Sequence, residues 1–184
     1  NKFKFPLKLI STEMPVGINY TAGVSAQLKS AVILAGLNSF GTTEINEIKA
    51  SRDHTEKMLQ KNSHAIKIIT SPKKIIKIFG KKYLNPTKIT IPGDPSSASF
   101  FTALTILNKN SRLLIKKVGL NPTRIGFYEL LKKHGAKIKF INKRILGNEI
   151  IGDIEVKSGQ LKKPIIASKE FYERTTDEFP ILFC

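Results

Sequence analysis

Three short segments carry side chains that could bind an anion or move a proton. The first is Ser25-Ala26-Gln27, which lies where a long apolar helix is expected to begin. A helix N-terminus presents free backbone N–H groups and a positive partial charge, and both favour a bound phosphate or carboxylate. A serine hydroxyl and a glutamine amide would complete such a site. The alternative is that Ser25 is an ordinary helix cap.

The second segment, SRDHTE, begins at Ser51 and places Arg52 at another expected helix start. An arginine there could hold a phosphate through two parallel hydrogen bonds. Near the end of the chain, Asp177 precedes an apolar run, where a helix dipole would favour the ionised carboxylate that a general base needs. The alternatives are an exposed helix start around Arg52 and an N-cap role for Asp177.

Two further motifs are harder to assign. The segment PGDPSS at residues 92–97 lacks the lysine and the spacing of a P-loop. We interpret it as a tight turn before a helix with proline in its first turn and serine as its cap. Arg124 lacks the acidic neighbours of Arg52, so its role stays open. His54 has no Cys, His or Asp partner at metal-ligand spacing, and no metal site is predicted.

The composition is that of a globular protein with a strong positive charge. The 184 residues include 31 Lys and Arg against 14 Asp and Glu, a net charge of +17, and 41% are hydrophobic, which argues against wholesale disorder. The apolar stretches are too short to span a bilayer. The charge fits nucleic acid, a membrane surface or a phosphorylated substrate, but the lysines are scattered. A basic nucleic-acid-binding module is therefore kept as an alternative.

A repeat organises the chain. Ser25-Ala26 aligns with Ser97-Ala98, and Arg52 with Arg124, at a spacing of 97 − 25 = 72 residues. Each copy predicts a β-α-β-α-β-β unit whose first helix is apolar nearly all round and therefore buried. The predicted strands are 16–20, 43–48, 65–70 and 74–79, then 88–91, 113–118 and 137–141, and the predicted helices are 25–37 and 96–107, with others after Ser51 and Thr123. A third unit is expected to begin near 154–156 and 164–167.

The polar segment 81–87, which contains a proline, is the candidate boundary between two domains. The chain begins without Met and ends inside an apolar run. We interpret both ends as cuts in a longer chain.

Together and in this order, the motifs resemble the 5-enolpyruvylshikimate-3-phosphate synthase family. The resemblance rests on VSAQLKS at 24–30, SRDHTEKML at 51–59, PGDPSS at 92–97, NPTR at 121–124 and DEFPIL at 177–182. It implies an α/β protein of repeated β-α-β-α-β-β units with buried helices, the inside-out α/β barrel of the enolpyruvyl transferases, incomplete in this chain. Residues 1–85 would be the last unit of the first domain. Residues 86–184 would be the first unit and the start of the second unit of the second domain.

The resemblance also implies an activity, the transfer of the enolpyruvyl group of phosphoenolpyruvate to the 5-hydroxyl of shikimate 3-phosphate, on the shikimate pathway to chorismate and the aromatic amino acids. Ser25, Ala26 and Gln27 would contact shikimate 3-phosphate, with Gln27 also near phosphoenolpyruvate. Arg52 would lie on the side of the same acceptor, and Asp177 would take the proton of the 5-hydroxyl. No cofactor or metal is implied, and no nucleic acid or membrane partner. The full-length protein would be a cytoplasmic monomer.

Two cationic segments of the family, Lys-Ser-Arg near its N-terminus and Lys-Glu-Ser-Asp-Arg after the aspartate helix, are absent from these residues. We therefore expect the 184-residue chain alone to show no turnover, because those segments supply most of the charge that stabilises the transition state. The sister enolpyruvyl transferase that acts on UDP-N-acetylglucosamine shares the fold and the reaction type. It is the closest alternative, although the Arg-Asp-His-Thr-Glu and Gly-Asp-Pro-Ser-Ser motifs favour the shikimate enzyme.

Overall fold

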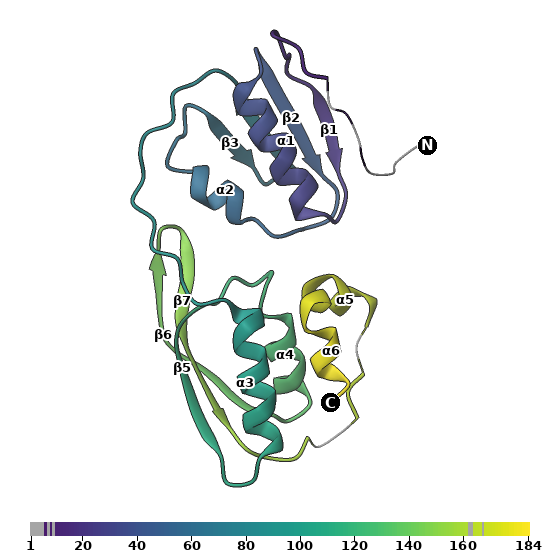
Figure 1. The fold of residues 1–184 in the computed structure, drawn as a ribbon, viewed down its shortest axis with the longest axis vertical. Coiled ribbons are helices and arrows are strands. Elements are labelled where there is room, and N and C mark those ends of the chain that lie inside the picture. The colour runs from purple at the N-terminus through teal and green to yellow at the C-terminus, as the bar shows by residue number, and fades with distance from the viewer. Residues whose placement is uncertain (1–5, 7, 9, 162–163, 167) are drawn as a thin grey trace. The chain divides into compact units, whose positions relative to one another are not determined.

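The computed structural model describes residues 6, 8, 10–161, 164–166 and 168–184. The chain divides into two compact units (Figure 1). The first contains residues 1–49 and 59–85, and the second contains residues 50–58 and 86–184. The segment 50–58, which carries Arg52, thus belongs to the second unit. Each unit is described by itself.

The first unit is a four-stranded sheet with a helix on one face. Its strands are β1 (Asn19–Ala22), β2 (Thr42–Glu47), β3 (Ile66–Ile69) and β4 (Lys74–Phe79), in the order β1-β2-β4-β3. β1 and β2 are parallel, and the other neighbours are antiparallel. A parallel pair needs a crossover connection, and α1 (Ala26–Asn38) supplies it and packs on the sheet (Figure 1). The short helix α2 (His54–Leu59) follows β2 in the chain.

The core of the first unit lies between α1 and the sheet. Alternate residues of β2 and β4 face it, and Ile45, Ile76 and Ile78 are fully buried there, as is Ile33 of α1. This period of two is the pattern of strands with one face on a core. It explains why β4 occupies the predicted range 74–79.

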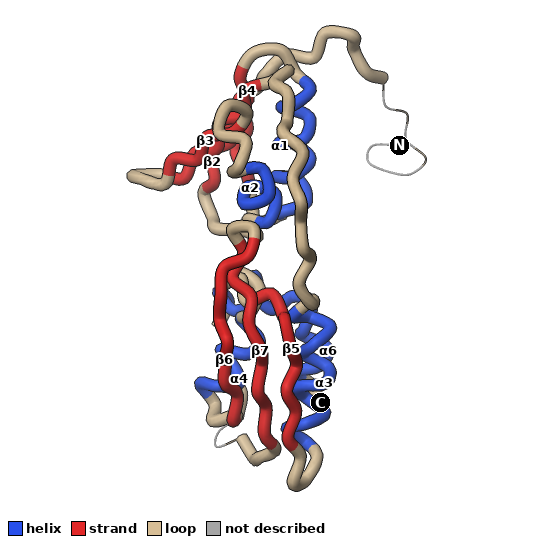
Figure 2. Tube along the Cα trace, turned by 90° about the vertical axis from the view of Figure 1, so that its left-hand side faces the viewer, coloured by secondary structure: helices blue, strands red, loops and turns tan. Residues whose placement is uncertain are grey.

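The second unit is a three-stranded antiparallel sheet covered by helices. Its strands are β5 (Arg112–Gly119), β6 (Lys137–Leu146) and β7 (Glu149–Lys157), in the order β5-β7-β6. The helices are α3 (Pro95–Leu107), α4 (Gly126–Lys133), α5 (Lys169–Thr175) and α6 (Phe179–Leu182), with the 3-10 turn η1 (Thr176–Glu178) between the last two. Figure 2 shows α3, α4 and α6 on the same face of the sheet.

The core of this unit lies between the sheet and α4. Phe127 and Tyr128 are buried with their rings edge to face, 5.3 Å between centroids, and Ile154 and Val156 of the central strand lie in the same cluster. The hydroxyl of Tyr128 donates to the carbonyl of Pro95 at 2.5 Å, which ties α4 to the start of α3. Burial raises the pKa of that phenol, so the hydroxyl keeps its proton at neutral pH.

The two units repeat one another at the predicted spacing. Thr21 of β1 pairs with Asn46 of β2, and an isolated parallel bridge joins Gly93 to Val118. The differences, 93 − 21 and 118 − 46, are both 72. The predicted α/β class with β-α-β-α-β-β units is confirmed. In the second unit, the bridge at Gly93 stands in place of the first strand of the repeat.

One predicted strand and the predicted start of a third unit are wrong. Residues 88–91 form no strand, because Ile89 and Ile91 stay exposed and Pro92 has no N–H with which to extend the Gly93 bridge. Residues 154–156 do not open a third unit, because they lie in β7 and complete the second sheet. Residues 164–166 form no strand either, and residue 167 lies outside the described residues.

The predicted burial of the two apolar helices is only half right. The face of α3 that packs on the sheet carries small residues, Ala98, Ser99, Thr102 and Thr105. Its opposite face carries Phe100, Leu104 and Leu107, which are about three-fifths exposed (61%, 58% and 65%). Each unit offers its helix one sheet, so one face of an all-round apolar helix stays uncovered in this chain. Among the described residues, no helix combines the length and the apolar character needed to cross a membrane.

Candidate functional site

The first unit holds Ser25, Ala26 and Gln27 at the N-terminus of α1. Ser25 has an extended backbone, and its Oγ accepts a hydrogen bond from the backbone N–H of Leu28 at 3.3 Å. The same hydroxyl donates to Oε1 of Gln27 at 3.5 Å. Ser25 is therefore the cap of the helix, as the alternative reading has it. Gln27 is exposed beside it, and the first turn contains no acidic residue that would repel an anion.

A buried ion pair fixes this end of α1 to the sheet. Lys29 is fully buried, and its Nζ lies 2.8 Å from Oε1 of Glu47, whose side chain is also buried. The other carboxylate oxygen of Glu47 forms an ion pair with Lys74, whose Nζ lies 2.5 Å away. Lys74 is the residue directly opposite Glu47 in the β2–β4 register. Buried charges need partners of this kind, so the pair defines how the turn after Gln27 sits on β2.

The second unit brings together the other two predicted residues. Nη2 of Arg52 lies 2.5 Å from Oδ2 of Asp177, although 125 positions separate them in the sequence. The side chains are 27% and 46% exposed, so the carboxylate keeps an open side. The arrangement presents a guanidinium and a carboxylate together, which suits an anionic substrate that carries a hydroxyl group.

The N-cap reading of Asp177 is wrong. Asp177 is the middle residue of η1, and α6 begins two residues later with Glu178 in the cap position and no side-chain cap bond. Its carboxylate is consequently directed by Arg52 rather than by the N–H groups of a helix.

Side chains around Arg52 hold its segment to the start of β7. Asn121 donates to Oδ1 of Asp53 at 2.7 Å and to Oε2 of Glu149 at 3.2 Å. Nδ1 of His54 lies 2.6 Å from Oε1 of Glu149. The structure thus gives His54, which has no partner at metal-ligand spacing in the sequence, a carboxylate partner. The two residues that follow Arg52 are therefore bonded to Asn121 and Glu149, which anchors this segment beside the start of β7.

The unassigned motifs meet beside Asp177. The cap of α3 is Asp94, with Pro95 at the first helical position, so the predicted serine cap is wrong. Arg124 donates to Oδ1 of Asp94 at 2.7 Å and to Oγ of Ser96 at 2.8 Å. Ser96 in turn donates a short hydrogen bond to Oε1 of Glu178.

The two carboxyls of this cluster titrate differently. Burial raises the pKa of Glu178 and outweighs the hydrogen bond from Ser96, and the negative charge of Asp177 raises it further. For Asp94, burial acts in the same upward direction, but hydrogen bonds from Ser97 and the charge of Arg124 outweigh it and lower the pKa. Of these two carboxyl groups, Glu178 is thus the one whose ionisation destabilises the folded protein.

We expect the Glu178→Gln variant to gain thermal stability relative to the wild type as pH rises. A raised folded-state pKa gives Glu178 a stability contribution that is present below its unfolded pKa and is lost as pH rises through the folded value. Gln does not titrate, so it does not suffer this loss. The thermal midpoints of both proteins, measured between about pH 4 and about pH 8, check this around the ordinary carboxyl range. The prediction is contradicted if the midpoint of Glu178→Gln minus that of the wild type falls as pH rises.

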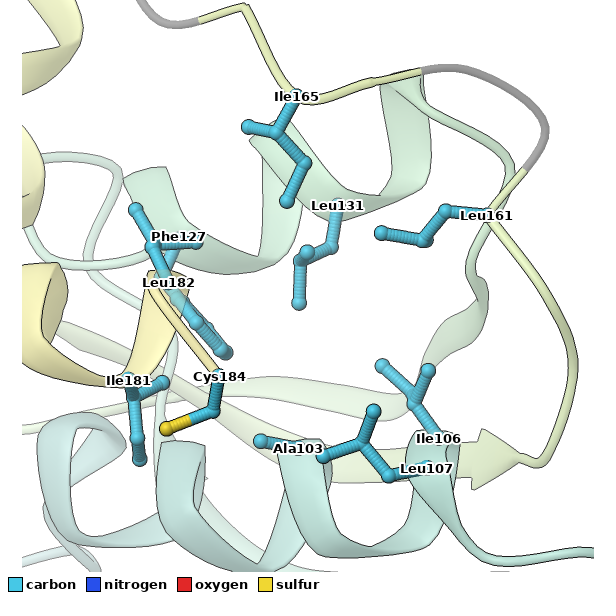
Figure 3. Close-up of a pocket in the computed structure, with 10 residues that line it drawn as sticks. All are labelled: Ala103, Ile106, Leu107, Phe127, Leu131, Leu161, Ile165, Ile181, Leu182 and Cys184. Atoms are coloured by element: carbon cyan, nitrogen blue, oxygen red, sulfur yellow. The ribbon is translucent and has the colours of Figure 1, made fainter.

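The second unit also contains an apolar cavity of ≈ 60 Å³ (Figure 3). Ile106 and Leu107 of α3, Phe127 and Leu131 of α4, and the exposed thiol residue Cys184 are among its lining side chains. This lining offers no charge for an anionic substrate. Within the described part of the chain, no group of three or more His, Cys, Asp or Glu side chains is arranged to hold a metal ion.

Sequence reasoning missed Lys29 and Glu178 as parts of the site's support. A lysine inside the apolar stretch AQLKSAVILAGLN was the available signal for the first, because a charge on a buried helix requires a partner. No comparable signal in the sequence indicated the hydrogen-bonded cluster around Glu178. That cluster joins three motifs that are distant in sequence, through Asp94, Ser96, Arg124 and Glu178.

Known proteins resemble this chain along nearly its whole length. The sequence model of the family EPSP synthase (3-phosphoshikimate 1-carboxyvinyltransferase) matches residues 1–179. A 3-phosphoshikimate 1-carboxyvinyltransferase of Thermodesulfovibrio yellowstonii is 45% identical over 176 residues, 96% of this chain and 39% of the relative. That of Dinoroseobacter shibae is 39% identical over 181 residues, 97% of this chain and 40% of the relative. The solved EPSP synthase of Acinetobacter baumannii superposes with a TM-score of 0.77 at 39% identity, covering 92% of this chain and 38% of that one. The chain thus spans about two fifths of the length of these relatives.

Proposed function

Because the chain belongs to the EPSP synthase (3-phosphoshikimate 1-carboxyvinyltransferase) family, we propose that it forms part of a transferase that moves the enolpyruvyl group of phosphoenolpyruvate onto shikimate 3-phosphate. The oxygen of the 5-hydroxyl bonds to the enolpyruvyl carbon, phosphate leaves, and the hydroxyl gives up its proton. The product lies on the route to chorismate and the aromatic amino acids.

The observation that carries the proposal is the contact between Arg52 and Asp177. It places a cation and a partly exposed carboxylate side by side at 2.5 Å. In the proposed reaction Arg52 binds the anionic acceptor, and Asp177 takes the proton of its 5-hydroxyl as the general base. Both belong to the second unit, and their contact is independent of how the first unit is placed.

The first unit supplies the remaining proposed contacts. Ser25, Ala26 and Gln27 would bind shikimate 3-phosphate through the backbone N–H groups and side chains at the N-terminus of α1, and Gln27 would also lie near phosphoenolpyruvate. We further propose that residues 1–85 close one domain and residues 86–184 open the next. The cytoplasmic location, the monomeric state and the lack of a resident cofactor stay predictions.

The names of the relatives support shikimate 3-phosphate over UDP-N-acetylglucosamine as the acceptor. The net charge of +17 was the support for a nucleic-acid partner, and several of these cations are engaged by carboxylates, among them Lys29, Arg52 and Arg124. Binding a small anionic substrate requires only a few cationic side chains, so the net charge does not by itself call for a nucleic-acid partner.

The test uses the complete coding sequence that contains these 184 residues. We expect it to restore growth without aromatic amino acids in a bacterium that lacks its own 3-phosphoshikimate 1-carboxyvinyltransferase. The purified protein should release phosphate only when phosphoenolpyruvate and shikimate 3-phosphate are both present. Phosphate release with UDP-N-acetylglucosamine instead would assign the chain to the sister reaction.

The 184-residue chain assayed alone is the matched control, and we expect no turnover from it. Steady turnover by that chain would show that the substrate contacts expected from other segments are not needed.

A further inference from the structure

Two segments that the proposed chemistry does not use converge on Glu178, the residue next to Asp177. Asp94 and Ser96 come from the start of α3, Arg124 from the loop before α4, and Glu178 from η1. Arg124 lies 2.7 Å from Asp94 and 2.8 Å from Ser96, and Ser96 is bonded to Glu178. We name the chain Asp94–Arg124–Ser96–Glu178 the polar link. All four residues belong to the second unit.

The polar link has a fixed direction. A guanidinium group only donates hydrogen bonds, so Oγ of Ser96 accepts from Arg124. The hydroxyl proton of Ser96 then points to Oε1 of Glu178. At the other end, Oδ2 of Asp94 accepts from the N–H and the hydroxyl of Ser97, both at 2.9 Å, which leaves Oδ1 for Arg124. Each side chain therefore has one orientation that satisfies its neighbours.

Glu178 is the buried end of the polar link. It is 3% exposed, whereas the neighbouring Asp177 is exposed and bonded to Arg52. The two carboxylates of η1 thus point to different partners, one inward to Ser96 and one outward to Arg52. A three-residue 3-10 turn has little rigidity of its own. These two attachments therefore help to set its direction, together with its contacts with α3, α5 and α6.

We propose that Glu178, Ser96 and Arg124 are positioning residues for Asp177, which hold η1 so that the carboxylate of Asp177 faces the acceptor hydroxyl. This inference rests on the proposed function of Asp177 as the base. The three residues act through η1 and do not touch the substrate. Proton transfer requires the base within hydrogen-bond reach of the hydroxyl, so a small rotation of η1 reduces turnover while leaving the groups that bind the substrate in place.

Ser96→Ala in the complete protein tests this proposal. Removing the hydroxyl disconnects Glu178 from Arg124, and we expect kcat to fall by roughly 10–100-fold, the order of loss that follows a misplacement of about 1 Å. The KM values for both substrates should stay within about twofold, because the loss falls on the transition state. Ser96→Thr keeps the hydroxyl and should restore most of kcat.

Ser99→Ala is the matched control. It removes a serine hydroxyl from the same turn of α3, where Ser99 donates to the backbone oxygen of Ser96 at 2.6 Å. We expect kcat close to that of the wild type, together with whatever small change in thermal midpoint the lost bond brings. A purely structural role for Ser96 predicts a different result for Ser96→Ala: a lower thermal midpoint, with kcat unchanged at temperatures below that midpoint. That result would overturn the proposal.

Arg124→Lys keeps a positive charge but not the fork that bonds two acceptors. It should lower kcat as Ser96→Ala does, and it provides the test should Ser96→Ala fail to fold. In the double variant the two losses should not multiply, because both changes break the same connection. Independent, multiplying losses would mean that Arg124 acts by another route and would overturn the polar link as a unit.

The outcomes separate this inference from the proposed function. If the wild-type protein releases no phosphate from shikimate 3-phosphate and phosphoenolpyruvate, the proposed function fails. A different result would overturn the positioning role alone. In that case the wild type is active and Asp177→Asn is inactive, but Ser96→Ala and Arg124→Lys both turn over at the wild-type rate.

Discussion

Asp177→Asn in the complete protein is expected to lower kcat by roughly 10²–10⁴-fold, the range for loss of a general base. Asn has the shape of Asp, and its Oδ1 can still accept from Arg52, so η1 should keep its position. The amide cannot take the proton of the acceptor hydroxyl. Removing the negative charge beside Arg52 should leave the KM for the anionic acceptor unchanged or lower.

Steady-state rates with both substrates, measured for Asp177→Asn and for Glu155→Gln, check this expectation. Glu155 also pairs with an arginine at 2.5 Å, but that partner, Arg112, is largely exposed and lies on the sheet. Glu155 is 13% exposed, but its partner is 70% exposed and the pair lies outside the proposed site, so Glu155→Gln should keep the wild-type kcat. Equal rates for the two variants would exclude Asp177 as the base.

Lys29→Met is expected to lower the free energy of unfolding by at most about 3–5 kcal/mol, the cost of removing one partner from a buried ion pair, because Lys74 still lies 2.5 Å from the other oxygen of Glu47. Met fills a similar volume, but the buried carboxylate of Glu47 loses its contact at 2.8 Å. The Lys29→Met, Glu47→Gln double variant should recover part of that loss, because the charge left without Lys29 is removed as well.

Denaturant unfolding followed by circular dichroism measures this loss, and Lys77→Met is its control. Lys77 pairs with Glu44 at 2.9 Å in the same sheet, but both side chains are about one-third exposed (35% and 30%). Its loss should cost at most about 1 kcal/mol. If Lys29→Met costs no more than Lys77→Met, the buried pair does not stabilise the turn that carries Gln27.

The repeat and the strands were predictable because they depend on local patterns. The apolar segment KIIKIF was predicted as a strand over the range that β4 occupies, and the spacing of 72 residues predicted the correspondence between the Thr21 pair and the Gly93 bridge. The prediction failed where tertiary partners decide the structure. Residues 88–91 are apolar enough for a strand, but a strand also requires a neighbour for its backbone groups.

The candidate site divides in the same way. The cap at Ser25 was predictable because capping depends on nearby residues and on the end of the helix, whereas anion binding by Ser25 and Arg52 stays a prediction. The pairing of Arg52 with Asp177 and the polar link could not be predicted, because each joins segments that only the folded chain brings together. A lysine in an apolar helix indicates that a partner exists, but the helix does not say that the partner is Glu47.

The packing of α3 has a mechanical consequence. Along the face that lies on the sheet, the hydroxyls of Ser99, Thr102 and Thr105 donate to carbonyls of their own helix. The polar attachments of α3 to other elements are concentrated at its first turn, where Asp94, Ser96 and the carbonyl of Pro95 are bonded to Arg124, Glu178 and Tyr128. The far end of α3 is held instead by apolar packing of Ile106 and by the bond from the N–H of Gly159 to the carbonyl of Ile106 at 3.4 Å. A substitution at that end should therefore disturb the neighbourhood of Asp177 less than one in the first turn.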